Sequence, residues 1–132
     1  MNRKEIEQRK YNRWEMATGR REIASTIREL SPDCKGVEIQ VKLSFISGVG
    51  KSEKGISRTL GKDDKAFLYH DCLNPDCTGF GFSLVDEIYS AIMSRQIIEG
   101  IKRCEGKEDW KYVDHAGCSC QSECMYRIIP IF

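Results

Sequence analysis

Residues 37–45, with the sequence VEIQVKLSF, alternate between apolar and polar side chains without an exception. In an extended chain the apolar side chains share one face and the polar ones share the other, which is typical of a β-strand with one buried face. A strand of this kind needs partner strands and a layer that covers its apolar face. The rest of the chain must therefore supply both a sheet and its cover.

Three further segments are predicted to be strands: AFLYH at 66–70, IKRC at 101–104, and the run from about residue 124 to the C-terminus. Pro130 fits the last of these only near an edge or a strand end, because proline donates no backbone hydrogen bond. Residues 47–65 are rich in glycine and charge, which predicts a long mobile loop or a loose hairpin tip.

A helix is predicted over residues 83–98, with an apolar face wide enough to cover the sheet. Ser83 and Asp86 have the spacing of a helix N-terminus, and Gly100 supplies a stop. Together the segments predict an α+β fold, in which a small antiparallel sheet of about four strands packs on one helix.

The N-terminal region is rich in Arg, Lys, Glu and Gln and contains no proline before residue 32, which favours helix. Gly19, after Thr18, is expected to divide it into helical pieces at 2–17 and 20–30. The second piece carries one apolar docking stripe, formed by Ile23, Ile27 and Leu30.

The charge of the chain is distributed unevenly. The net charge is +1, but residues 1–65 contain 15 basic and 10 acidic residues, whereas residues 66–132 contain 6 and 10. We expect two parts, a basic helical arm at 1–33 and a cysteine-rich α+β domain at 34–132. The basic half favours an anionic partner.

No window approaches the roughly 18 consecutive apolar residues of a membrane-spanning helix, and the first residues lack the apolar stretch of a secretory signal. We therefore expect a cytoplasmic protein with no membrane partner. In that reducing compartment the seven cysteines would remain thiols rather than form disulfides.

Six of the seven thiols lie in the C-terminal half, which indicates a shared role in binding a metal. Cys72 and Cys77 flank the turn LNPD with a Cys-x4-Cys spacing that structural zinc sites use. Zinc takes four ligands in a tetrahedron, and thiolates suit it as soft donors. The expected zinc ligands are Cys72, Cys77, Cys104 and Cys120, with Cys118, His115 and His70 in reserve.

Within residues 66–132, CLNPDC followed by GFGFSL and later by CEG and CSC resembles the knuckle, helix and second knuckle of small bacterial zinc-ribbon and treble-clef-like proteins. The two pairs are further apart than in compact ribbons. A zinc ion held by four thiolates has no open coordination position, so it would stabilise the fold without taking part in catalysis. Cys34 and Cys124 are expected to be ordinary buried thiols.

Catalytic motifs are not apparent. SGVGKS lacks the first glycine of a phosphate-binding loop, because Phe45 stands at that position. No acid–base set with the required spacing is visible either, which favours a non-enzymatic binding module.

The surface of the arm is the expected binding surface. Its cations are interleaved with Tyr11 and Trp14, which suits phosphate contact and base stacking, although acids three or four residues away would also suit a solvated helix. Arg58 and Lys62 add charge within residues 47–65. The expected nucleic-acid contacts are Arg9, Lys10, Arg13, Arg20, Arg21, Lys51 and Lys54. The alternatives are a protein–protein adaptor and a thiol-based redox sensor.

Overall fold

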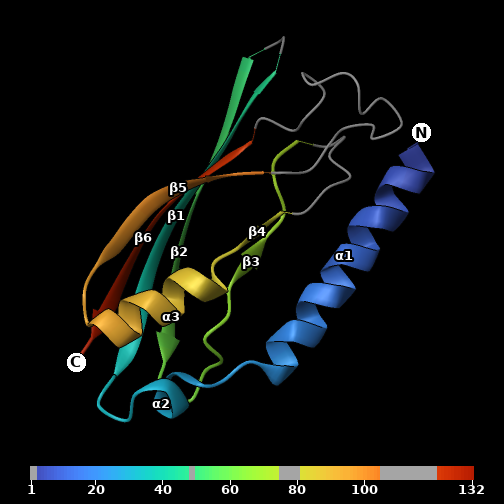
Figure 1. The fold of residues 1–132 in the computed structure, drawn as a ribbon. Coiled ribbons are helices and arrows are strands. Elements are labelled where there is room, and N and C mark those ends of the chain that lie inside the picture. The colour runs from blue at the N-terminus through green and yellow to red at the C-terminus, as the bar shows by residue number, and fades with distance from the viewer. Residues whose placement is uncertain (1–2, 48–49, 75–80, 105–121) are drawn as a thin grey trace.

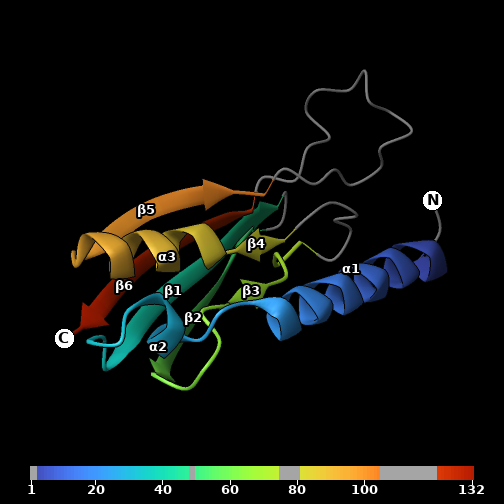
Figure 2. The same cartoon turned by 60° about the horizontal axis from the view of Figure 1, so that its bottom comes forward.

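The computed structural model describes residues 3–47, 50–74, 81–104 and 122–132. In this part of the chain a four-stranded antiparallel sheet carries two helices on one face, α2 (Ile27–Leu30) and α3 (Val85–Ser94). A third helix, α1 (Arg3–Ile23), extends away from the sheet (Figures 1 and 2). The predicted α+β class and the antiparallel sheet of four strands are confirmed.

The alternating segment forms the strand on which the sheet is built. β1 (Gly36–Ser47) lies between two neighbours, in the strand order β2-β1-β6-β5. Its apolar positions from 37 to 43 are all buried against the helices, and its even-numbered side chains from 38 to 42 are exposed on the other face. The sheet therefore has one covered face and one open face.

Residues 47–65 are not the expected long loop, because most of them belong to β2 (Gly50–Gly61). β2 pairs with β1 along its whole length, from Ser47 opposite Gly50 to Gly36 opposite Gly61. It is an edge strand with mostly exposed side chains, so its sequence shows no apolar alternation. Its backbone hydrogen bonds with β1 stabilise it instead.

The strand predicted at 66–70 is wrong as a member of the main sheet. Its last two residues form β3 (Tyr69–His70), which pairs with β4 (Phe82–Ser83) in a separate two-stranded sheet. The fourth strand of the main sheet is β2, which the apolar pattern did not reveal.

Both predicted C-terminal strands are present, but the first begins three residues earlier than predicted and ends before Cys104. β5 (Ile98–Arg103) and β6 (Glu123–Ile131) pair from Ile98 opposite Ile128 to Arg103 opposite Glu123. Pro130 lies beyond the end of β5, so β1 is its one neighbour within the sheet. This is the strand-end position that proline tolerates.

Helix α3 covers the sheet as predicted, with Ile88, Ala91 and Ile92 buried, but its ends differ from the expectation. Leu84 precedes its first turn without a side-chain cap, so the predicted cap by Ser83 is wrong. The helix stops at Arg95, whose left-handed φ of 56° ends the helical hydrogen bonding. Gly100 lies within β5, where an added Cβ would meet the ring of Tyr126.

Helix α1 runs through Thr18 and Gly19, so the predicted division of the arm is wrong. A glycine inside a helix costs about 1 kcal/mol, which the helix formers around it offset. The break comes at 24–26, before α2. It also separates the predicted docking stripe, because Ile23 is 85% exposed while Ile27 is fully buried.

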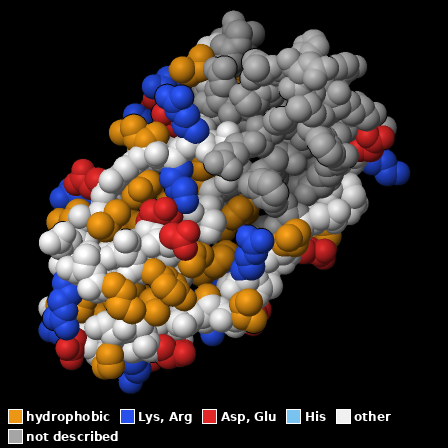
Figure 3. Space-filling model, in the orientation of Figure 1, with side chains coloured by type: hydrophobic (Ala, Val, Ile, Leu, Met, Phe, Trp, Pro, Cys, Tyr) orange, Lys and Arg blue, Asp and Glu red, His pale blue; other side chains and the backbone are white. Residues whose placement is uncertain are grey.

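The core is one cluster between the covered face of the sheet and the two short helices. It joins Ile27 of α2, Ile88 of α3 and Ile128 of β6 to the apolar face of β1. Figure 3 shows the helical side, where hydrophobic side chains gather over α3 and toward α1. Among the described helices, none is long and apolar enough to cross a lipid bilayer.

Candidate functional site

The linker between α1 and α2 is fixed to the segment that follows β2. Ile27 N donates to Asp64 O at 3.0 Å, Arg28 N donates to Lys62 O at 2.8 Å, and Ala66 N donates to Ser25 O at 2.8 Å. These backbone bonds join residues that are far apart in sequence. They place the C-terminal end of α1 next to the end of β2.

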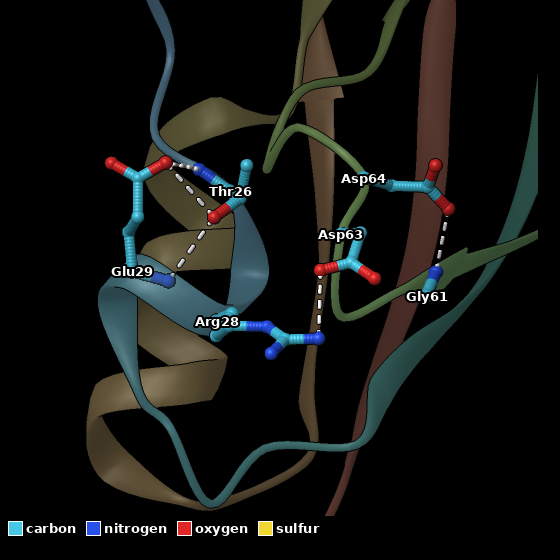
Figure 4. Close-up of polar contacts among 6 residues, drawn as sticks. All are labelled: Thr26, Arg28, Glu29, Gly61, Asp63 and Asp64. Carbon is cyan, nitrogen blue, oxygen red and sulfur yellow. Dashed lines mark hydrogen bonds and ion pairs between the residues drawn. The ribbon is translucent and has the colours of Figure 1, made fainter.

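Side chains reinforce this junction (Figure 4). Thr26 begins α2 with a capping box, since its Oγ1 accepts from Glu29 N at 3.2 Å and the Glu29 carboxylate accepts from Thr26 N at 3.2 Å. Thr26 N and the Thr26 hydroxyl both donate to this carboxylate, at 3.2 and 3.0 Å, and they lower the pKa of Glu29 below its usual value. The entry of the short helix is thus held by its own residues.

Both acids of the connecting turn are engaged (Figure 4). Asp63 forms an ion pair with Arg28 at 2.8 Å. Asp64 Oδ2 accepts from Gly61 N at 2.7 Å, which closes the turn after β2. Lys65 Nζ donates to the carbonyl oxygen of Ala24 at 2.8 Å, so its charge stays at the junction.

The junction borders a pocket of about 660 Å³ between α1, β2 and β3, which we name the junction pocket. Its cationic lining comes from three elements of the chain: Arg21 of α1, Arg58 of β2, and Lys65 in the connection to β3. Within the described part of the chain, the guanidinium groups of Arg21 and Arg58 form no ion pair. The engaged acids Asp63 and Asp64 also line it.

His70 of β3 lines the same pocket. Its Nε2 is buried and has no hydrogen-bond partner among the residues that the structure describes. Burial lowers the pKa of His70 below its usual value, and the positive charges of Arg58 and Lys54 lower it further, whereas Asp71 acts in the opposite direction. The ring therefore lies in positive surroundings.

Two of the predicted zinc ligands are described, and both are buried. Cys72 and Cys104 belong to the same core cluster, with exposed fractions of 6% and 4%. Cys77, Cys120, Cys118 and His115 lie outside the described residues. Among the described residues, no group of three or more Cys, His, Asp or Glu side chains is arranged to hold a metal ion. The four-sulfur site stays a prediction.

A backbone hydrogen bond connects the two sides of segment 105–121. Cys104 N donates to Ser122 O at 3.0 Å, immediately before and after that segment. In sequence, Cys120 is two residues from Ser122 and Cys118 is four. The chain thus re-enters the described structure beside Cys104.

The other two described thiols are ordinary core groups, as expected. Cys34 Sγ donates to Gly36 O at 3.3 Å. Cys124 is fully buried in β6, and burial raises its pKa to about 11. A thiol of this kind is protonated at neutral pH and is a poor nucleophile.

The predicted nucleic-acid contacts fall into several environments. Arg9, Lys10 and Arg13 lie in α1, but their side chains are outside the described ones. Arg20 lines a second pocket with Tyr89 of α3, separate from the junction pocket that Arg21 lines.

On β2, the two predicted lysines point to opposite faces. Lys51 lies on the open face and pairs with Glu53 at 2.7 Å, which offsets its charge. Lys54 lies opposite Leu43 on the covered side, where its charge acts on His70.

Sequence reasoning missed the grouping of Lys65 and His70 with the two arginines. The sequence of β2 does contain a signal for this grouping, because alternate positions of a strand share one face. These positions are Lys54, Ile56, Arg58 and Leu60. Once residues 50–61 are taken as a strand, this repeat places Arg58 on the face toward α1.

In comparisons with known proteins, no family model, no curated protein and no solved structure matches this chain.

Proposed function

We propose that this protein is a zinc-stabilised binding module without enzymatic activity, which contacts nucleic acid through the basic arm and the adjoining edge of β2. One observation carries the proposal: Arg21 of the arm and Arg58 of β2 line one pocket without an ion-pair partner among the described residues. Cations that are not neutralised by acids are available to phosphates.

The arrangement of the arm supports this proposal. Helix α1 is 21 residues long and extends from the sheet, and its described side chains are exposed, apart from the half-buried Thr18. Tyr11 is 53% exposed and available for stacking on a base. Arg9, Lys10 and Arg13 precede Arg21 in the same helix and would extend the cationic surface.

The zinc part of the proposal rests on Cys72 and Cys104, which are buried in one core cluster. The hydrogen bond from Cys104 to Ser122 favours Cys120 as a further ligand, because Cys120 lies two positions before Ser122 in the sequence. Cys77 would complete the set from its pair with Cys72. Thiolates of this kind require the reducing cytoplasm in which we propose that the protein resides.

A protein adaptor is the alternative, and one observation favours it. Ile101 and Met125 are paired neighbours on the open face of the sheet, 56% and 48% exposed. Exposed apolar neighbours of this kind suit a protein surface better than a phosphate backbone.

Fluorescence anisotropy with labelled single-stranded and double-stranded oligonucleotides tests the nucleic-acid proposal. We expect binding that weakens as salt rises, with a slope of about 0.7 to 0.9 in log K per phosphate contacted. Replacing both Arg20 and Arg21 by glutamine should weaken binding and lower the slope. Arg103→Gln, on the open face of β5, is the matched control and should change neither. Absence of binding, or binding that is independent of salt, would contradict the proposal.

Native mass spectrometry tests the zinc proposal on the intact chain. We expect one zinc ion per chain, which a chelator removes. Cys72→Ser and Cys104→Ser should abolish zinc retention, whereas Cys34→Ser should retain it. A folded protein that contains no stoichiometric metal would contradict this part.

A further inference from the structure

We propose that the junction pocket binds a phosphoryl group, held by Arg21, Arg58 and the Nε2 of His70. This inference deepens the proposed function, on which it rests, by naming the chemical group that the site recognises. The pocket of about 660 Å³ falls within the range of small-ligand sites, about 300 to 1,000 Å³.

The balance of charge favours an anion. Lys65 keeps its charge at the pocket while it donates to the carbonyl of Ala24. Of the two acids in the lining, Asp63 is paired with Arg28, and the negative charge of Asp64, whose carboxylate accepts from Gly61 N, is matched by the positive charge of Lys65. Arg21 and Arg58 are therefore the excess charges that attract a ligand. Their planar guanidinium groups match two oxygens of a phosphoryl group.

His70 supplies the buried polar group that such a site needs. A buried ring nitrogen without a partner is costly, and an oxygen acceptor from a ligand would satisfy it as an N–H donor. Arg58 lines the same pocket as the ring, and its positive charge attracts an anion to that pocket.

The wall of the pocket is fixed before any ligand arrives. The bonds from Ile27 to Asp64 and from Ala66 to Ser25 hold the end of α1 against the turn after β2. Arg58 projects from a strand that is paired along its whole length. The backbone that carries both cations is thus in place before binding, so the ordering cost is limited to their side chains.

Histidine ring signals in NMR report on the pocket directly. The chain has two histidines, His70 and His115, so a His115→Gln variant assigns the signals. Inorganic phosphate is titrated against the full chain at fixed pH and fixed ionic strength, with chloride as the balancing anion. We expect a saturable shift of the His70 signal. Arg58→Gln and Arg21→Gln should each weaken phosphate binding by about tenfold, the effect of losing one charge-assisted hydrogen bond. Arg103→Gln should leave it unchanged.

Oligonucleotides with and without a 5′-phosphate identify the source of the phosphoryl group. If the site takes a free or terminal group, the 5′-phosphorylated strand binds more tightly and inorganic phosphate competes with it. If it takes a phosphodiester of the backbone, both strands bind equally and Arg58→Gln weakens both. Either result supports the inference.

A His70 signal that phosphate shifts no more than chloride does, together with oligonucleotide binding that Arg58→Gln does not change, would overturn it. Because the phosphate titration contains no nucleic acid, it is independent of the proposed function. Phosphate binding without oligonucleotide binding would refute nucleic-acid recognition and leave the phosphoryl site standing. Oligonucleotide binding that depends on the arm but not on Arg58 would leave nucleic-acid recognition standing and refute the phosphoryl site.

Discussion

Cys124 lies in β6 between Leu43 of β1 and Lys102 of β5, and it is fully buried. Lys102 Nζ is not directed to the sulfur, because it donates to Glu87 at 3.0 Å and to the carbonyl of Ser83 at 2.8 Å. Burial is the main cause of the raised pKa of this thiol, while the charges of Lys102 and Glu87 act on it in opposite directions.

This pKa predicts that stability falls at high pH. The pKa of Cys124 is about 11 in the folded protein, against 9.0 for a free thiol, so only the unfolded chain loses this proton between these values. The unfolded state then binds fewer protons, and the free energy of unfolding decreases with rising pH, by roughly 3 kcal/mol in all. Urea denaturation at pH 8 to 11 measures it. The Cys124→Ala variant should lack this component, and an identical pH dependence in both proteins would contradict it.

At the scale of elements, α1 and the α1–α2 junction are stabilised in different ways. Among the described elements, α1 packs extensively on none of the others. Helix α2, by contrast, packs on α3 through the buried Ile27. Among the described residues, the junction depends on capping and backbone bonds rather than on packing of α1.

Glycine substitutions distinguish a helix from a tightly paired strand. A Cβ at Gly19 would meet nothing within 4 Å, so Gly19→Ala should stabilise α1 by about 1 kcal/mol. Circular dichroism at 222 nm should show a higher helix content and a later loss of it on heating. Gly36→Ala is the contrasting variant, because its Cβ would lie 2.7 Å from the carbonyl oxygen of Leu60. It should destabilise the sheet, and equal effects of the two variants would refute this reading.

Loss of the capping box should loosen the junction. Thr26→Ala removes the acceptor for Glu29 N and should cost about 1 kcal/mol. Amide hydrogen exchange should then accelerate at Ile27 and Arg28, which donate to the turn after β2. Thr59→Ala, on β2, serves as the control and should leave exchange at these two amides unchanged. Unchanged exchange in Thr26→Ala would show that the backbone bonds alone hold the junction.

The ion pair between Glu87 and Lys102 links α3 to β5 at the edge of the core. The side chain of Glu87 is 15% exposed and that of Lys102 is 34% exposed. Glu87→Gln would leave a half-buried cation with weaker acceptors, at a cost of about 1 to 3 kcal/mol. Chemical denaturation measures this loss. The exposed pair of Arg95 with Asp33 is the comparison, and Asp33→Asn should cost less than about 1 kcal/mol. Equal losses would mean that burial of the first pair contributes nothing.

At the scale of the molecule, local patterns predicted those parts of the fold that bury an apolar face. The alternation in β1 and the apolar face of α3 both follow from burial, so both were readable. β2 could not be predicted in this way, because an edge strand with exposed side chains is held by backbone hydrogen bonds. These bonds do not determine which side chains the strand carries. The predicted break at Gly19 was wrong because the free-energy cost of one glycine in a helix is small compared with the helix propensity of its neighbours.

The sequence predicted only part of the candidate site. Arg21 and Lys54 were predicted from charge alone, but their relation to His70 depends on how β2 and β3 approach α1. That approach is set by hydrogen bonds between residues some forty positions apart, such as Lys65 to the carbonyl of Ala24. Contacts of this kind have no local signature in a sequence.

The bond between Cys104 and Ser122 has a consequence for how the molecule could be altered. It continues the pairing of β5 and β6 by one bond beyond Arg103 and Glu123, so the strand register is fixed up to both ends of residues 105–121. A change in the length of that segment should therefore leave the register of the sheet unchanged, provided that Cys120, the proposed zinc ligand, is kept.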